Sequence, residues 1–145
     1  MATAAKIKTK SLKQSRTFSA SAKDVFDAIM DSKKHAKFTG APAKISTKVG
    51  GKHEAHGGYC SGVNLELVPG KKIVQTWRGA GWPEGHYSTI TYALASAGKG
   101  RTKLSFTHTG IPASEIEGIK KGWINHYWKP MEQMFTGQTI VHPTM

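Results

Sequence analysis

The sequence predicts an α+β fold in which a curved antiparallel sheet of about six to seven strands packs against one long C-terminal helix. The chain has 145 residues, enough for a single domain with its own core. Apolar and polar residues alternate between residues 43 and 109, as in strands. On either side of that block the apolar residues recur every three or four positions, as in helices. A block of strands with helices outside it is typical of an α+β arrangement.

The N-terminal part predicts one strand followed by two short helices. Residues 10–18 alternate weakly and form the first strand. Ser21 is placed to cap a helix, and Asp24 stands three residues later, where a carboxylate can complete a capping box. Apolar residues at helical spacing follow through residues 25–30, and a second short helix is expected over 32–38.

The central block predicts a meander of antiparallel strands joined by short turns, among them a tight turn at Pro69–Gly70. In one strand Leu65 and Leu67 are expected to face opposite to Asn64 and Glu66. The last strand should place Leu104, Phe106 and His108 on one face. The expected strands cover residues 43–47, 50–60, 63–68, 72–79, 86–96 and 101–109.

The C-terminal part predicts one long amphipathic helix that lies on the sheet. Ser114 and Glu117 match a second capping box, and Pro130 should disturb the helix because it removes a backbone hydrogen bond. The domain is therefore expected to run from 10 to 136, with a basic tail at 1–9 and a second tail at 137–145. The apolar face of the helix consists of Ile116, Ile119, Trp123, Tyr127, Met131 and Met134.

The chain is strongly basic, with a net charge of +12 and most of the excess in residues 1–52. Such a surface could attract nucleic acid, an anionic membrane or an acidic protein. Because lysine dominates and only three arginines occur, the favoured interpretation is a solvated lysine surface that keeps the protein soluble. The sequence contains no run of 18 apolar residues, so it predicts no membrane-spanning helix. The single cysteine, Cys60, fits a reducing compartment, and we expect a cytoplasmic monomer.

No catalytic or metal-binding constellation is evident, so the sequence predicts neither an enzyme nor a cofactor. Cys60 has His56 nearby in sequence but no third orienting group. His53, Glu54 and His56 match no standard zinc spacing, and positions 53 and 56 point to opposite faces of a strand. We interpret them as an exposed polar strand.

Aromatic residues on the long helix and the facing strands either fill the core or line a ligand pocket between sheet and helix. His108 would then anchor a polar group of the ligand, or it is a core histidine bonded to a neighbour. Trp82 lies in the connection "RGAGWPEG", which ends just before His86. We expect Trp82 to be exposed and, together with His86, to lie at the cavity mouth or against a partner. The candidate ligand-binding residues are Trp77, Tyr92, Phe106, His108, Trp123, Tyr127 and Met131.

Six sequence segments resemble, in the same chain order, those of a known family. It resembles the START-like, or birch-pollen-allergen-like, helix-grip superfamily. Within it, the chain is similar to the C-terminal domain of the activator of heat-shock-protein-90 ATPase. The segments are "FSASAKDVFDAIMD" (18–31), "FTGAPAKIS" (38–46), "LELVPGKKIVQTWR" (65–78), "WPEGHYSTITYAL" (82–94), "TKLSFTHTGIP" (102–112) and "GWINHYWKPM" (122–131).

The resemblance implies a helix-grip fold and two possible functions. The first is a non-enzymatic module that holds a small hydrophobic or amphipathic ligand in the cavity between sheet and helix. The alternative is a co-chaperone that binds heat shock protein 90 and stimulates its ATPase. Full activators of this family carry a separate N-terminal domain that this sequence lacks, so the ligand-binding module is the first expectation.

Overall fold

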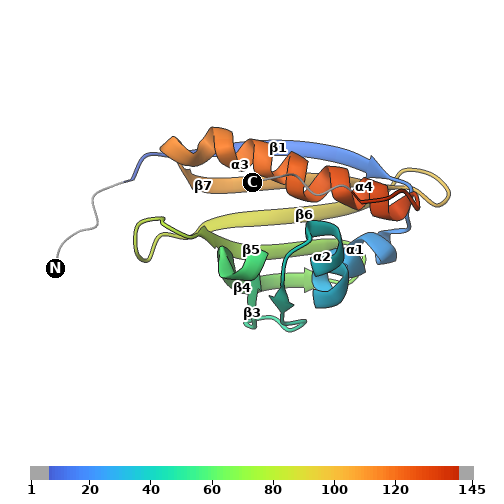
Figure 1. The fold of residues 1–145 in the computed structure, drawn as a ribbon, viewed down its shortest axis with the longest axis horizontal. Helices are drawn as coiled ribbons and strands as arrows, with labels where there is room; N and C mark the ends of the chain where they lie inside the picture. Colours follow the sequence, from blue (N-terminus) through green and yellow to red (C-terminus); the bar gives the residue numbers. More distant parts are fainter. Residues whose placement is uncertain (1–6, 141–145) are drawn as a thin grey trace.

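The computed structural model of the chain describes residues 7–140, which form one seven-stranded antiparallel sheet and a long helix (Figure 1). The strand order is β1-β7-β6-β5-β4-β3-β2. β1 is thus an edge strand that pairs with β7, and β2 to β7 form a meander in which each strand pairs with the next. The strands are β1 (Thr9–Phe18), β2 (Lys44–Ile45), β3 (Lys52–Ala55), β4 (Cys60–Val68), β5 (Lys72–Gly79), β6 (Ser88–Ser96) and β7 (Thr102–Pro112).

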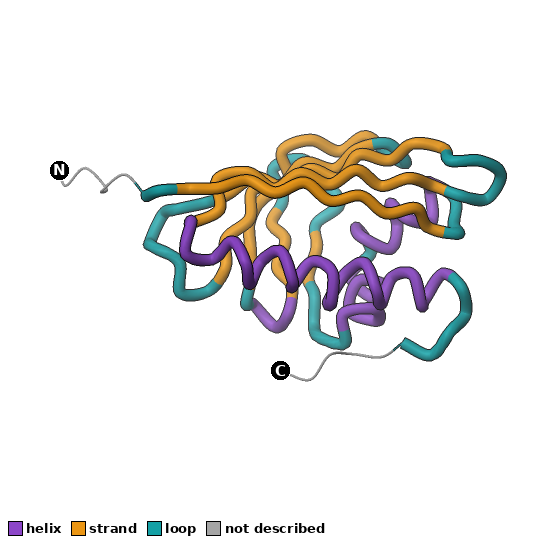
Figure 2. The backbone as a smooth tube through the Cα atoms, turned by 90° about the horizontal axis from the view of Figure 1, so that it is seen from above, coloured by secondary structure: helices purple, strands orange, loops and turns teal. Residues whose placement is uncertain are grey.

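The helices of the described chain lie on one side of the sheet, and the core fills the space between these two layers (Figure 2). Strand β5 alternates strictly between buried and half-buried residues, as expected for a sheet with one face on a core. The helical elements are α1 (Ala22–Met30), α2 (Ser32–Thr39), η1 (His56–Gly58), η2 (Ala113–Glu115), α3 (Ile116–Trp123), η3 (Ile124–Trp128) and α4 (Lys129–Phe135). The α+β helix-grip class predicted from the sequence is confirmed.

Local signals in the sequence explain the first two helices. The Ser21 hydroxyl accepts a hydrogen bond from the backbone N–H of Asp24 (3.1 Å), so α1 begins where the capping pattern predicted. Asp31 ends α1 and caps α2 through the N–H of Lys34 (2.9 Å). Gly40 then takes a left-handed conformation (φ 76°) and ends α2.

The second capping box, at Ser114 and Glu117, is not formed. Residues 113–115 make the 3₁₀ turn η2, and α3 begins at Ile116 without a side-chain cap. A capping serine needs extended backbone, whereas Ser114 lies inside a helical turn. The turn is fixed from outside the helix, because the Ala113 N–H donates to the Lys8 carbonyl beside β1 (2.8 Å).

The long helix contains the disturbance that Pro130 predicted, in the form of a π-helical turn just before it. η3 spans Ile124–Trp128, and the N–H of Lys129 bonds to the carbonyl of Ile124. Pro130 follows directly in α4, and its ring has no N–H to donate to the preceding turn. The wider turn buries two consecutive residues, Tyr127 and Trp128, on the face toward the sheet.

The predicted facing of β4 is wrong at one point. Asn64 is fully buried, and Leu65 is 47% exposed. The pairing of β4 with β5 shifts between Asn64 and Glu66, which is a β-bulge. The Asn64 amide donates to the carbonyls of Ser46 (2.7 Å) and Lys48 (2.9 Å), and Gln75 donates to its oxygen (2.9 Å). Asn64 is therefore inside because it holds the β2–β3 connection.

The first strand and the last helix are joined by one side chain. Gln14 on β1 donates to the carbonyl of Lys120 (3.1 Å) and accepts from the indole N–H of Trp128 (2.6 Å). Both partners lie on the long helix, more than 100 residues away in sequence. Gln14 thus fixes how the helix lies along the sheet edge.

Candidate functional site

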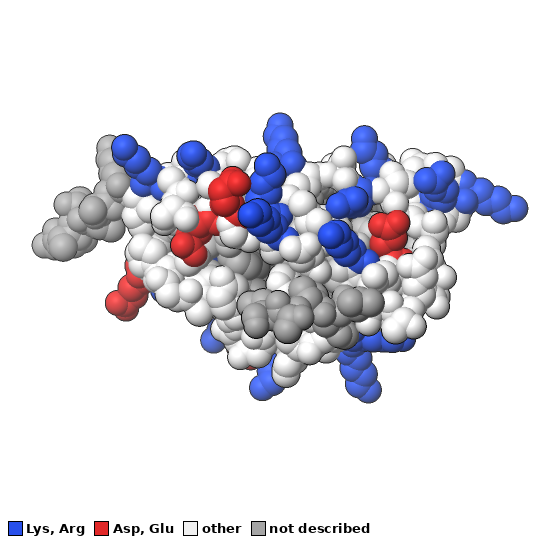
Figure 3. Space-filling view, turned by 45° about the horizontal axis from the view of Figure 1, so that its top comes forward, with Lys and Arg blue, Asp and Glu red and all other residues white. Residues whose placement is uncertain are grey.

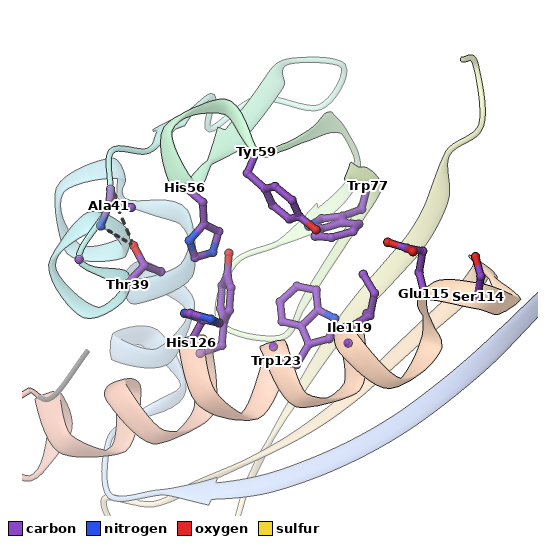
Figure 4. A pocket seen from close by; sticks show the side chains of 14 residues that line it. Thr39, Ala41, His56, Tyr59, Trp77, Ser114, Glu115, Ile119, Trp123 and His126 are labelled. Atoms are coloured by element: carbon purple, nitrogen blue, oxygen red, sulfur yellow. Dashed lines mark hydrogen bonds between the residues drawn. The ribbon is translucent and has the colours of Figure 1, made fainter. Parts of the chain in front are cut away.

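A pocket of about 620 Å³ opens between the long helix, the end of α2 and the turn η1 (Figure 4). Its walls are largely aromatic: Tyr59 follows η1, Trp77 lies on β5, and Trp123 and Tyr127 come from the helix. Trp123 and Tyr127 lie with ring centroids 4.5 Å apart, and Trp77 is 5.8 Å from Trp123. This volume falls within the range of small-molecule sites.

The polar atom of Trp123 points away from the pocket into a chain of buried hydrogen bonds. Its indole N–H donates to His108 Nδ1 (3.0 Å), and His108 Nε2 lies 2.7 Å from the Ser88 hydroxyl, which donates to the Trp77 carbonyl (2.7 Å). Burial lowers the pKa of His108 to about 3, so the ring is neutral. Since Nδ1 accepts, Nε2 carries the proton and donates to Ser88.

Tyr127 is fixed in the same way by His35 on α2. His35 Nδ1 lies 2.9 Å from the Ile29 carbonyl, and its Nε2 lies 2.9 Å from the Tyr127 hydroxyl. A carbonyl only accepts, so Nδ1 carries the proton. Burial lowers the pKa of His35 to about 4, which leaves Nε2 as the acceptor of the Tyr127 hydroxyl. The pocket therefore meets the rings of Trp123 and Tyr127 and not their polar atoms.

Two histidines lie side by side where Tyr127 meets the pocket mouth. The rings of His56 and His126 have centroids 5.7 Å apart, and His56 also contacts the Tyr127 ring. Burial lowers the pKa of His56 to about 4, with the neighbouring His126 as a second cause, and burial lowers the pKa of His126 as well. His56 has a left-handed backbone (φ 54°), an unfavourable conformation for a residue with a side chain.

Two glycines of α3 leave one wall of the pocket without side chains. Gly118 and Gly122 are four residues apart on the same helix face, and both line the pocket. A Cβ atom added at either position would meet no atom within 4 Å. Glycine in a helix interior costs about 1 kcal/mol relative to alanine. The two glycines therefore lower the intrinsic stability of α3 and leave open space at the pocket wall.

The structure brings three of the seven predicted ligand-binding residues to the pocket: Trp77, Trp123 and Tyr127. Tyr92, Phe106, His108 and Met131 are buried and do not line it. Phe106 lies directly behind Trp123, with ring centroids 4.4 Å apart. Tyr92, Phe106 and His108 contact the Trp123 ring from the core side, and a ligand-binding role for the whole set stays a prediction.

The expected exposure of Trp82 is wrong. Its side chain is 4% exposed and lies 5.3 Å from Trp77, ring centroid to ring centroid. It covers Gly79, where an added Cβ would be 2.8 Å from the indole nitrogen. The loop folds inward because Arg78 donates to the Trp82 carbonyl and the Trp82 N–H donates to Gly79. His86 is half-buried beside Trp82 and bonds to the Gly110 carbonyl (2.8 Å), so neither residue lines the pocket.

The expected exposed polar strand at His53–His56 is wrong for both histidines, whereas Glu54 on β3 is exposed as expected. His53 is buried, and its Nε2 bonds to the Thr76 carbonyl (2.7 Å) across Gly62, where any side chain would collide with that carbonyl. His56 lies outside the strand, in η1, at the pocket. Within residues 7–140, no three His, Cys, Asp or Glu side chains come together as a metal site would require. No helix in the same residues is long and apolar enough to span a membrane.

Sequence reasoning missed most of the pocket mouth. Tyr59, His56 and His126 come together because η1 folds beside the long helix. No local sequence pattern predicts that position of η1. The glycine pair at 118 and 122 was the available signal, since glycines four residues apart inside an amphipathic helix need a packing or functional reason.

The fold and this pocket define the class: the chain is a helix-grip protein with an aromatic-walled pocket beside its long helix. Comparison with family models then gives the family, because residues 19–136 match the Activator of Hsp90 ATPase homolog 1-like protein family. The chain belongs to this family.

Relatives of known name agree with this assignment. The chain is 38% identical over 115 residues to the activator of 90 kDa heat shock protein ATPase homolog of Dictyostelium discoideum, covering 79% of this chain and 30% of that protein. It is 36% identical over 130 residues to homolog 1 of Homo sapiens, covering 90% of this chain and 38% of that protein. The chain thus spans about a third of the length of these relatives.

Solved structures show the same fold. A crystal structure of an HSP90 activator from Plasmodium falciparum superimposes with a TM-score of 0.83 at 28% identity, covering 89% of this chain and 97% of that one. CalU16 from Micromonospora echinospora gives a TM-score of 0.70 at 21% identity, covering 89% and 74%, and shares the fold alone.

Proposed function

We propose that the chain is a co-chaperone that binds heat shock protein 90 and stimulates its ATP turnover without being an enzyme itself. The observation that carries the proposal is the match to the Plasmodium falciparum HSP90 activator, which covers 97% of that chain. The solved chain described as an HSP90 activator corresponds nearly end to end to this one, which supports the proposal. Identity to the human and Dictyostelium activators supports it. The proposal places the chain in the cytoplasm.

The charge distribution supports an acidic partner surface. Lys and Arg side chains gather over β1 and the long helix on one face (Figure 3). β1 contributes Lys10, Lys13 and Arg16, and α3 contributes Lys120 and Lys121. The ion pairs Lys23–Asp27 and Lys72–Glu66, found within residues 7–140, do not involve these residues. Acidic side chains also lie on this face, but Lys and Arg outnumber them, and an excess of one charge sign accelerates association with a partner of the opposite sign.

The test is the ATP turnover of purified heat shock protein 90 with increasing amounts of the chain. We expect turnover to rise to a plateau, and an inhibitor of the chaperone's ATP site should abolish all of it. Unchanged turnover, together with no binding by calorimetry, would exclude the proposal. Binding without stimulation would retain the partner and exclude the activating role.

As a second function we propose that the pocket binds a small apolar or amphipathic molecule. The observation that favours it is the unfilled space of about 620 Å³ beside a helix that keeps two glycines at its wall. Gly122→Leu should fill that space and still fold, because nothing lies within 4 Å of the added Cβ. Lys121→Leu, on the exposed side of the same helix, is the matched control. If Gly122→Leu binds apolar probes as well as the wild type does, the pocket is not the binding site.

A further inference from the structure

The two edges of the sheet are protected to very different degrees. At one edge, β2 has two residues, and the N–H of Ile45 already donates to the Ser32 hydroxyl of α2 (2.9 Å). At the other edge, β1 has ten residues, and no strand of the described chain lies beyond it (Figure 1). An edge strand leaves every second N–H and C=O without a strand partner. The free edge of β1 is therefore a template for pairing with another extended chain.

The free edge of β1 is open to solvent. Most side chains of the strand are exposed, whereas Leu12 and Phe18 face the core. Figure 2 is seen from the β1 side, and the long helix lies in the layer below the strand. The helix contacts β1 through Gln14, which points toward that layer and not along the sheet. An added strand would meet no described element in its way.

The charges along this edge select the partner. β1 carries Lys10, Lys13 and Arg16 and contains no Asp or Glu. Neither ion pair found within residues 7–140 uses these cations. Lys120 lies beside the strand, because its carbonyl accepts from Gln14. The β1 edge of a second copy would bring like charges together, which destabilises strand pairing, whereas opposite charges on neighbouring strands stabilise it.

From these observations we propose that the free edge of β1 binds an extended, acidic segment of a partner protein as an additional strand of the sheet. The backbone of that segment hydrogen-bonds to the free N–H and C=O groups of β1, and its Asp and Glu side chains lie next to the lysines of β1 and α3. Main-chain hydrogen bonds then provide affinity, and the charges provide specificity. The inference goes beyond the proposed co-chaperone function, because it concerns how an acidic segment is held and is tested without the chaperone.

The first test measures binding of a labelled peptide that is as long as β1 and alternates Glu with Thr, by fluorescence anisotropy at low salt. The control is the same peptide N-methylated at a pair of neighbouring central residues. Neighbouring N–H groups point to opposite edges of a strand, so this change blocks both edges and keeps the charge. We expect the control to bind about tenfold more weakly, because it loses main-chain hydrogen bonds. Equal binding of both peptides would mean that charge alone attracts them and would overturn strand addition.

The second test locates the peptide by amide hydrogen exchange of the full chain, followed by NMR. Without peptide, every second residue of Thr9–Phe18 should exchange quickly, because its N–H points away from β7. With the Glu–Thr peptide, these same amides should become protected, and the amides of β2 should not change. Protection at another element without protection in β1 would place the peptide elsewhere and exclude the proposal.

The third test reverses the charge of the edge with Lys10→Glu combined with Lys13→Glu, both at exposed positions. We expect the Glu–Thr peptide to bind about tenfold more weakly, and the corresponding Lys–Thr peptide to bind this variant but not the wild type. The matched control is Lys48→Glu combined with Lys52→Glu near the opposite edge, which changes the net charge equally.

Two further outcomes would contradict the inference. If both double variants lose the Glu–Thr peptide equally, net charge governs binding and the edge of β1 does not. If the wild type does not bind the unmodified peptide even at low salt, the free edge accepts no acidic strand. Neither result bears on whether the chain stimulates the chaperone, so the proposed function is judged separately by ATP turnover.

Discussion

Trp123 holds a single orientation because each group in its hydrogen-bonded chain has one possible role. The neutral His108 ring accepts from the indole and donates to Ser88, and Ser88 donates to the Trp77 carbonyl. Trp77 and Trp123 both line the pocket, so the chain links two of its walls through the core. At the scale of single residues, the pocket is preorganised before any ligand arrives.

Trp82→Ala should destabilise the protein by about 3–5 kcal/mol, because it removes a buried indole and leaves a cavity. The ring is 4% exposed and packs on Trp77 and Gly79. The measurement is chemical denaturation followed by circular dichroism. Tyr87→Ala, an exposed aromatic in the same loop, is the control and should change stability by less than about 0.5 kcal/mol. A small effect at Trp82 would mean that this loop does not contribute to the core.

Stability should fall as the pH drops from about 6.5 toward 4. Unfolded histidines take up a proton near pH 6.5, whereas His35 in the folded chain does so only at about 4 and His108 at about 3. The unfolded state therefore binds more protons in this range, and acid favours it. Guanidinium unfolding at pH 7.5, 6 and 5 measures the trend. An unfolding free energy that does not change between pH 7.5 and 5 would contradict the neutral state of these rings.

At the scale of elements, the long helix combines three devices: a glycine pair, a π-helical turn and a proline. The glycines open the pocket, the π-helical turn buries Tyr127 and Trp128 together, and Pro130 lies where the helix resumes. Each of them lowers the intrinsic stability of the helix, which is instead held by packing against the sheet.

Gly118→Ala and Gly122→Ala should each stabilise the protein by about 0.8–1 kcal/mol, because alanine is the better helix former and its methyl group meets open space. Thermal unfolding measures the gain. The same substitution at Gly62 is the contrast: its Cβ would overlap the Thr76 carbonyl beside His53, and we expect a loss of about 2 kcal/mol or more. Stabilisation at Gly62, or loss at the helix glycines, would contradict the packing described.

Periodicity alone predicted the order of strands and helices, because that order follows from local patterns. It failed where a distant group decides the outcome. Asn64 turns inward because the carbonyls of Ser46 and Lys48 need a donor, and Trp82 turns inward because Gly79 leaves room for it. In the same way, Trp77, Trp123 and Tyr127 were identifiable from strand and helix faces, whereas the mouth depends on how η1 folds.

For the whole molecule, the basic face over β1 and α3 is the surface that we expect to meet an acidic partner. Lys120→Glu combined with Lys121→Glu should slow association with heat shock protein 90 about tenfold at low salt and reduce the salt dependence of the rate. Surface plasmon resonance at two salt concentrations measures both effects.

The matched control is Lys48→Glu combined with Lys52→Glu. These residues lie near the opposite edge of the sheet, and their substitution changes the net charge by the same amount. Equal losses in both double variants would mean that net charge alone governs association. No loss in either would mean that the chaperone binds a different face.

The contacts of Gln14 also determine when β1 can pair during synthesis of the chain. Among the described strands β1 pairs with β7 alone, and Gln14 bonds to Lys120 and Trp128, so the first strand has no partner until β7 and the long helix have been made. At about 5–20 residues per second, the ribosome leaves this strand unpaired for many seconds. We expect the charges of Lys10 and Lys13 to oppose pairing of this strand with other nascent chains during that time.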